Sequence, residues 1–120
     1  MSRVILTVDD SPSMRQMVSF TLRGAGYEVV TASDGAQAIE YARNNPVDLV
    51  LTDVNMPGMD GLTLVRELRG LPNCRLTPML VLTTEASQDK RAIGKQAGAT
   101  GWILKPFNPE QLLATIARVL

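Results

Sequence analysis

Five short apolar runs constrain the fold of this 120-residue chain more than any other feature. Each is rich in Val, Ile or Leu and too short for a stable helix, which is typical of strands covered on both faces. We predict strands at VILTV (4–8), YEVVTA (27–32), VDLVL (47–51), MLVLT (79–83) and WILK (102–105). The third run stops at Thr52 and Asp53, so a carboxylate stands at the tip of a buried strand.

Segments with helical spacing separate these runs. The first helix has Ser11 as its N-cap, Pro12 at its first position and Gly24 as its stop signal. Further helices are predicted at 34–44, 60–69, 86–97 and from Asn108 onward. Five alternating strands and helices predict an α/β fold, a doubly wound five-stranded parallel sheet. We expect one domain over 1–120, with no output domain.

Composition excludes several classes of function. Twelve basic and twelve acidic side chains cancel, so no global field favours nucleic acid. No apolar run approaches the ~18–20 residues of a membrane span, and the N-terminus lacks a signal peptide. A single cysteine, Cys74, suits a reducing compartment, so we expect a cytoplasmic protein. The absence of histidine excludes His-based triads, His-ligated zinc and a phosphohistidine on this chain.

Polar side chains stand at the carboxyl ends of four predicted strands. In an open parallel sheet these ends meet at one edge, where ligands bind. The residues are Asp9 and Asp10, then Asp53, Thr83 with Thr84, and Lys105. Singly, each has an ordinary interpretation: acids before a helix, a turn residue, a β-branched strand end and a surface charge. Their complementary types together favour a site.

The chemistry of such a site follows from its charges. Clustered carboxylates repel one another, and a hard divalent cation such as Mg²⁺ relieves the repulsion. An ammonium and a hydroxyl suit phosphoryl oxygens. The set therefore indicates phosphoryl transfer, with one carboxylate available as the nucleophile.

The same residues resemble a known family. Asp9-Asp10, LTDVNMPGMDG around Asp53, VLTTEA with Thr83 and GWILKPF with Lys105 are similar to the receiver domains of two-component response regulators, especially CheY-like single-domain members. The resemblance implies the strand order 2-1-3-4-5, which is established for CheY and not deduced from these residues. It also implies that Asp53 accepts a phosphoryl group from the phosphohistidine of a kinase.

The resemblance assigns a role to each site residue. Asp10, Asp53 and the backbone carbonyl of Asn55 would bind Mg²⁺, or another divalent cation such as Mn²⁺, with Asp9 acting through water. Thr83 and Lys105 would contact the phosphoryl oxygens. The protein would then be a switch and not an enzyme in the usual sense, because it catalyses only its own phosphorylation and dephosphorylation.

Further positions concern switching and tuning. Thr83 would move toward the phosphate, with Trp102 swinging inward where the family more often has Tyr or Phe. The alternative for Trp102 is a half-buried side chain that stabilises the sheet edge. Asn55 and Glu85 stand where the family tunes the entry of attacking water, and this pair resembles chemotaxis regulators.

The resemblance also implies partners. We expect a CheA-like histidine kinase as phosphodonor and a downstream protein, such as a flagellar motor switch protein, with a phosphatase as a further candidate. The protein would be a monomer with no nucleic-acid or membrane partner. Its contact face would carry Lys90, Arg91, Lys95 and Trp102, and the alternative is an ordinary solvated helix face.

Other functions stay open. The chain would also suit a phosphorelay intermediate or a phosphate sink outside chemotaxis. A Mg²⁺-dependent phosphatase of the haloacid-dehalogenase type needs a second acid two residues after its nucleophile, where this chain has Asn55. In a flavodoxin-like electron carrier, Asp9 and Asp10 would repel the cofactor phosphate. A receiver-like interaction module without phosphorylation is the remaining alternative.

Overall fold

The predicted strands and helices are present in the computed structural model, which describes residues 3–84 and 88–120. These residues form a five-stranded parallel sheet in the order β2-β1-β3-β4-β5, which confirms the predicted fold class and strand order. The strands are β1 (Val4–Val8), β2 (Glu28–Ala32), β3 (Leu49–Asp53), β4 (Met79–Thr83) and β5 (Gly101–Leu104). The helices are α1 (Pro12–Gly24), α2 (Gly35–Asn44), α3 (Gly61–Arg69), α4 (Gln88–Ala97) and α5 (Pro109–Val119).

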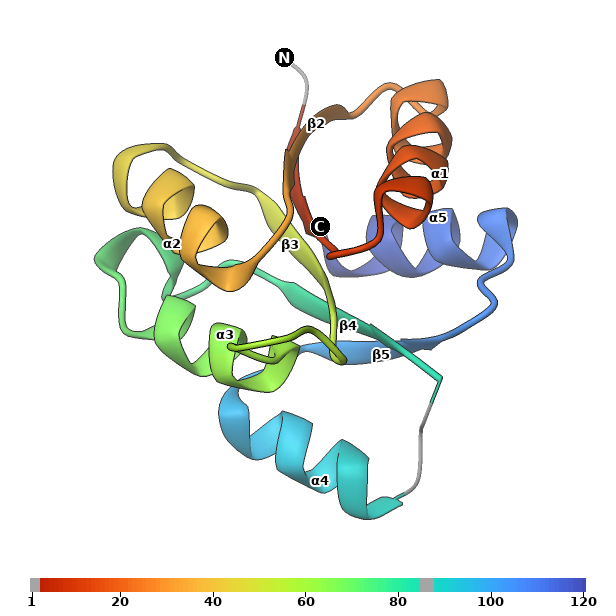
Figure 1. The fold of residues 1–120 in the computed structure, drawn as a ribbon. Helices are drawn as coiled ribbons and strands as arrows, with labels where there is room; N and C mark the ends of the chain where they lie inside the picture. Colours follow the sequence, from red (N-terminus) through yellow and green to blue (C-terminus); the bar gives the residue numbers. More distant parts are fainter. Residues whose placement is uncertain (1–2, 85–87) are drawn as a thin grey trace.

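Helices cover both faces of the sheet. Helices α1 and α5 lie on one side, and α2, α3 and α4 lie on the other (Figure 1). Alternate strand residues point to opposite sides, so that Leu49 and Leu51 join the core under α1 and α5 while Val50 joins the core under α2 and α3. Strand β3 is buried along its whole length. A strand packed on both faces holds the residue at its tip in a fixed position.

Capping residues fix where four helices begin. The side chains of Ser11, Asp34, Asp60 and Asn108 each accept a hydrogen bond from a backbone N–H in the first turn of α1, α2, α3 and α5 respectively. Each bond satisfies a donor that would otherwise lack an intrahelical partner. The predicted caps at Ser11 and Asn108 are confirmed.

The third strand differs from its prediction. It runs from Leu49 to Asp53, two residues later at each end than the apolar run indicated. At its start, Asp48 uses its carboxylate to accept a hydrogen bond from the N–H of Val4, at 2.7 Å. At its end, Asp53 pairs with Leu82 of β4. Pairing between strands, not apolar composition, therefore sets both ends, and Asp53 is the last strand residue and not the first turn residue.

Two smaller features complete the fold. A short 3₁₀ helix, Pro72–Cys74, was not predicted, and its cysteine is buried. Strand β5 ends one residue before Lys105, which the sequence pattern had placed inside the strand. Within the described parts of the chain, no helix is long and apolar enough to cross a membrane.

Candidate functional site

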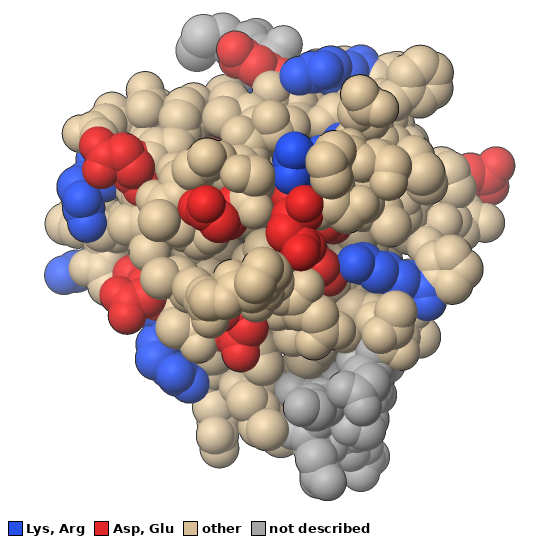
Figure 2. All heavy atoms as spheres, viewed as in Figure 1, with Lys and Arg blue, Asp and Glu red and all other residues tan. Residues whose placement is uncertain are grey.

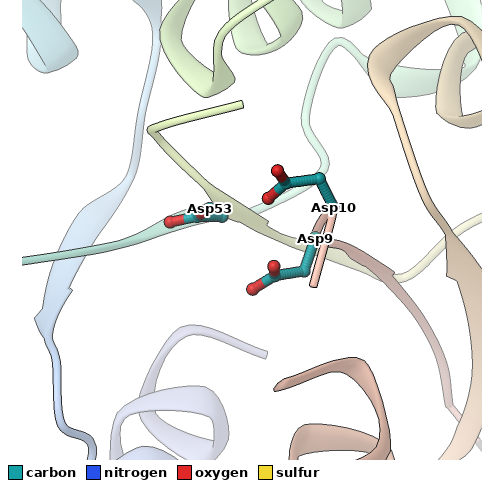
Figure 3. Close-up of side chains that lie close together, drawn as sticks. All are labelled: Asp9, Asp10 and Asp53. Atoms are coloured by element: carbon teal, nitrogen blue, oxygen red, sulfur yellow. The ribbon is translucent and has the colours of Figure 1, made fainter. Parts of the chain in front are cut away.

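Three aspartates meet at the carboxyl edge of the sheet. Asp9 and Asp10 follow β1, and Asp53 ends β3, the strand next to β1. One carboxylate oxygen from each lies within 4.8 Å of the other two. Figure 3 shows the three carboxylates directed to the same side of the edge. Asp9 and Asp53 are buried and Asp10 is exposed, so the cluster opens to solvent on one side.

Two contacts hold Asp9 in place. The N–H of Ser11 donates to Asp9 Oδ1 at 2.9 Å, and the guanidinium of Arg15 donates to the Asp9 carbonyl at 2.6 Å. Burial raises the pKa of the Asp9 carboxyl, and the nearby charges of Asp53 and Asp10 raise it further. The Ser11 hydrogen bond and Lys105 act on this pKa in the opposite direction.

Lys105 places an ammonium group against two of the three aspartates. Its Nζ lies 2.7 Å from Asp53 Oδ1 and 3.9 Å from Asp9 Oδ2. Its backbone N–H donates to the Thr83 carbonyl at 2.8 Å, which aligns it beyond the end of β5. A cis peptide bond joins Lys105 to Pro106. The ammonium thus reaches across β4 to the tip of β3.

Gly61 lies directly against the backbone of Asp53. A Cβ at residue 61 would collide with the Asp53 carbonyl oxygen and lie 2.9 Å from the Val54 Cα. The Gly61 N–H also donates to the Val54 carbonyl at 2.9 Å. Only glycine permits the start of α3 to pack so closely on the end of β3. Sequence reasoning missed this residue, although the glycine at a helix start in Met59-Asp60-Gly61 was an available signal.

Thr83 and Trp102 occupy the neighbouring strands. Thr83 is buried at the end of β4, one residue past the partner of Asp53. Trp102 is half-buried in β5 and packs against the core on the α2–α3 side. Its indole lies close to Gly94 of α4. The half-buried position of Trp102 in an edge strand is compatible with the alternative given for it, and its switching role stays a prediction.

Some predicted residues are only partly placed. Asn55 is exposed in the loop after β3, two residues beyond Asp53. Glu85 lies outside the described residues, and the side chains of Lys90 and Arg91 are not described. Lys95 is exposed on α4. The face drawn in Figure 2 carries side chains of both signs, with acidic ones near its middle.

The donor set fits a hard divalent cation. Three carboxylates supply oxygen ligands, and the exposed side of the cluster leaves room for water, which Mg²⁺ retains in protein sites. Burial, together with the charges of Asp53 and Asp10, raises the pKa of Asp9, and a bound cation would favour its ionised form. These residues therefore suit Mg²⁺ better than metals that prefer thiolate or imidazole ligands.

Comparison with known proteins identifies the family. Residues 5–117 match the model of the response regulator receiver domain, and the chain belongs to this family. Receiver domains are signalling switches that take phosphate from histidine kinases, bind Mg²⁺ at an acidic site and act on downstream targets.

Solved structures show the same relationship. The chain is similar to the chemotaxis response regulator CheY4 of Vibrio cholerae, with 52% identity, a TM-score of 0.96 and full coverage of both chains. It is also similar to the receiver domain of the sensor histidine kinase PA1611 of Pseudomonas aeruginosa, solved with a magnesium ion coordinated in its active site cleft. That match has 34% identity and a TM-score of 0.90, and it covers 98% of this chain and 97% of the other.

Curated relatives of the chain include transcriptional regulators. The DNA-binding response regulator MtrA of Mycolicibacterium smegmatis is 36% identical over 97% of this chain and 50% of its own length. The regulatory protein PhoP of Bacillus subtilis, which controls alkaline phosphatase synthesis, is 33% identical over all of this chain and 49% of its own length. The chain thus spans about half the length of these relatives.

Proposed function

We propose that this chain is a phosphorylation-activated switch in which Asp53 accepts a phosphoryl group from the phosphohistidine of a kinase. The observation that carries the proposal is the position of Asp53. Its carboxylate ends a buried strand, 2.7 Å from the Lys105 ammonium and within 4.8 Å of ligand oxygens of Asp9 and Asp10. A nucleophile, a cation for phosphoryl oxygens and a set of metal ligands thus meet at one point.

The transfer is a displacement at phosphorus. A carboxylate oxygen of Asp53 attacks, the P–N bond to the kinase imidazole breaks, and the bonding electron pair stays on the imidazole nitrogen. The Lys105 ammonium already donates a hydrogen bond to Asp53 Oδ1. It is therefore placed to bind a phosphoryl oxygen as negative charge shifts from the carboxylate to the phosphoryl group. The Thr83 hydroxyl is the proposed second donor.

Asp10, Asp53 and the backbone carbonyl of Asn55 would hold Mg²⁺, with Asp9 acting through water. The cation would neutralise charge on the carboxylates and the phosphoryl oxygens and so allow two anions to approach. Mn²⁺ prefers the same oxygen ligands and would substitute.

We propose chemotaxis as the pathway, with a CheA-like kinase as donor and a flagellar motor switch protein as target. The similarity to CheY4 of Vibrio cholerae over the full length of both chains supports this assignment. In this proposal the protein is cytoplasmic and monomeric and acts as a single receiver domain. A phosphatase would remove the phosphoryl group from Asp53. Asn55 and Glu85 would tune the rate at which the protein hydrolyses its own aspartyl phosphate.

A second candidate is a receiver that serves transcription, a phosphorelay or a phosphate sink. The curated relatives that regulate transcription favour it. A pull-down with the phosphorylated and unphosphorylated protein distinguishes the two. Phosphorylation-dependent capture of a motor switch protein supports chemotaxis, and capture of no motor component under either condition contradicts it.

The test of the central proposal is direct. Incubation with Mg²⁺ and acetyl phosphate should add one phosphoryl group to the intact mass, and Asp53→Asn should abolish the adduct. Asp34→Asn is the matched control, because asparagine caps a helix as well as aspartate does. An adduct that persists in the Asp53 variant, or none in the wild type, would refute the assignment.

A further inference from the structure

Strand β2 is an edge of the sheet, so some of its backbone groups have no partner strand. In a parallel pair, alternate residues direct both their N–H and their C=O toward the same neighbour. The Glu28 N–H and the Ala32 carbonyl both bond to backbone groups that flank β1. Val29 and Thr31 therefore direct their N–H and C=O groups away from the sheet. Within residues 3–84 and 88–120, these outward groups take part in one hydrogen bond, from the Arg23 guanidinium to the Val29 carbonyl at 3.4 Å.

Two hollows follow this free edge, one on each face of the sheet. The hollow on the α1 side has a volume of about 700 Å³, and the hollow on the α2 side has a volume of about 620 Å³. Thr31 lines both, so the two hollows meet at the edge of β2. The α1-side hollow is lined from Pro12, at the start of the helix, to Gly24, at its end. At ~1.5 Å per helical residue it is roughly 20 Å long, which is the length of about six residues of extended chain.

Two guanidinium groups lie at different levels of the α1-side hollow. Arg15 donates to the Asp9 carbonyl at 2.6 Å, and Arg23 donates to the Val29 carbonyl at 3.4 Å. By the register of β1 on β2, the level of Asp9 is four strand positions beyond Val29. Four positions span about 13 Å, and residues four apart point to the same face of a strand. The two arginines therefore suit two separate anionic groups on one face of an extended chain.

Both arginines are available to such groups. Neither forms a salt bridge with any of the described residues. A guanidinium has five N–H donors, so each keeps donors beyond its bond to a carbonyl. No acidic side chain is among the described residues that line this hollow. Its charge is therefore complementary to acidic side chains.

The space between and behind the two arginines is apolar. Phe20 lies between them along α1, lines the same hollow and is 82% exposed. The α2-side hollow is lined by Val30, Ala36 and Tyr41, together with Glu40, which would repel an acid. Apolar side chains therefore suit the middle of the α1-side hollow and the whole of the α2-side hollow.

We propose that the edge of β2 binds an extended acidic segment of another protein, which pairs with β2 as a sixth strand. The segment has two acidic residues four positions apart, with three apolar residues between them. Its backbone bonds to the outward groups of Val29 and Thr31, and its acidic side chains pair with Arg15 and Arg23. A backbone N–H of the segment replaces the long bond of Arg23 to the Val29 carbonyl and leaves that guanidinium to the acid.

The apolar side chains of the segment alternate between the two hollows. The central one lies on the same face as the acids and covers Phe20, and the two beside it enter the α2-side hollow near Tyr41. The proposal does not depend on phosphorylation of Asp53.

The test is an NMR titration of the ¹⁵N-labelled protein, without divalent cations, with the peptide Ser-Gly-Glu-Val-Leu-Val-Glu-Gly-Ser blocked at both ends. The amide signals of Phe20, Arg23, Val29 and Thr31 should shift in a saturable manner. A control peptide with the central order Glu-Val-Leu-Glu-Val places its acids on opposite faces of a strand. It should bind at least about fivefold more weakly, because one acid then meets no arginine.

Modified backbones test the pairing itself. One analogue is N-methylated at leucine and another at both valines, so the missing N–H groups lie on opposite edges of the bound strand. One analogue should bind at least about fivefold more weakly, and the other should bind as the unmodified peptide does. Equal binding by both analogues would overturn the proposal, because it would show that no strand forms.

Variants of the protein locate the site. Thr31→Pro removes an outward N–H, which an edge strand tolerates, and should weaken binding. Replacing one peptide glutamate by glutamine should weaken binding to the wild type and leave binding to Arg23→Gln unchanged. Arg66→Gln, on the exposed side of α3, is the control and should bind as the wild type does. Thermal unfolding of each variant shows whether it is folded.

Three further results would overturn the proposal. They are the absence of saturable shifts along β2, equal binding by the control peptide, and equal effects of Arg66→Gln and Arg23→Gln. Sedimentation velocity without peptide tests the remaining occupant. A dimer that protects the Thr31 amide would show that a second copy of the chain covers this edge, and it would also overturn the proposal.

Discussion

The indole of Trp102 fills the space that a side chain at residue 94 would need. A Cβ added to Gly94 of α4 would lie 2.5 Å from Cζ2 of the ring. The large indole of Trp102 in β5 therefore packs directly against a glycine, Gly94, in α4.

Gly94→Ala should force these groups apart. Overpacking of this kind costs about 1–3 kcal/mol, partly offset by the roughly 1 kcal/mol helix preference of alanine. We expect a lower free energy of unfolding in urea and altered tryptophan fluorescence, since Trp102 is the single tryptophan. Gly24→Ala, with no atom within 4 Å of the added Cβ, is the control and should be close to neutral. Wild-type stability and fluorescence in the Gly94 variant would contradict the contact.

Gly61→Ala should displace the backbone of Asp53, because α3 packs closely on β3 at this residue. The new Cβ would press on the Asp53 carbonyl, so either the start of α3 or the tip of β3 must move. We expect a loss of about 2–4 kcal/mol in the free energy of unfolding and a slower gain of the phosphoryl adduct. Urea titration and intact mass at fixed times measure these effects. Adduct formation at the wild-type rate would show that Asp53 does not depend on this packing.

Asp9→Asn should stabilise the protein in the presence of chelator at neutral pH. The pKa of Asp9 is raised above its ordinary value of 3.8, mainly by burial, so the folded state disfavours the ionised form. Wild-type stability from this group is therefore present below pH 3.8 and falls as the pH rises through the folded pKa. The stability gain of the variant should grow across that window and then level off. Urea unfolding from pH 3 to 7 tests it, and a gain independent of pH would contradict the sign.

Asp10→Asn should have opposite effects on stability and metal binding. It removes one of three clustered negative charges, so the metal-free protein should melt at a higher temperature. It also removes a proposed ligand, so calorimetric titration should show weaker Mg²⁺ binding. Asp34→Asn, outside the cluster, should change neither. A lower melting temperature, or undiminished Mg²⁺ affinity, would count against a strained metal site.

Lys105→Met should show that the lysine ammonium and Mg²⁺ compete for the carboxylates of the site. Without the ammonium, Asp53 and Asp9 lose their nearby cation, so the metal-free protein should lose on the order of 1–3 kcal/mol, less than for a fully buried pair because Lys105 is partly exposed. Mg²⁺ should bind more tightly, since it no longer meets a positive charge. A double-mutant cycle with Asp53→Asn measures the coupling, and coupling near zero would mean that the 2.7 Å contact contributes nothing.

The sequence by itself determined the elements and the residue types of the site. Short apolar runs, helical spacing and caps such as Ser11 and Asn108 are local patterns, and they predicted the alternating strands and helices. Polar strand ends predicted that Asp9, Asp10, Asp53 and Lys105 meet at one edge, and the structure brings these four together. The strand order followed from the family resemblance and not from these patterns.

Only the tertiary structure decided the contacts between distant segments. Lys105 and Asp53 are 52 residues apart, and the match of Trp102 to Gly94 joins β5 to α4. Pairing with β4 placed Asp53 inside β3, which the apolar run alone did not show. Local periodicity predicts the secondary structure that each segment prefers, whereas close packing of the folded chain determines which distant atoms are in contact.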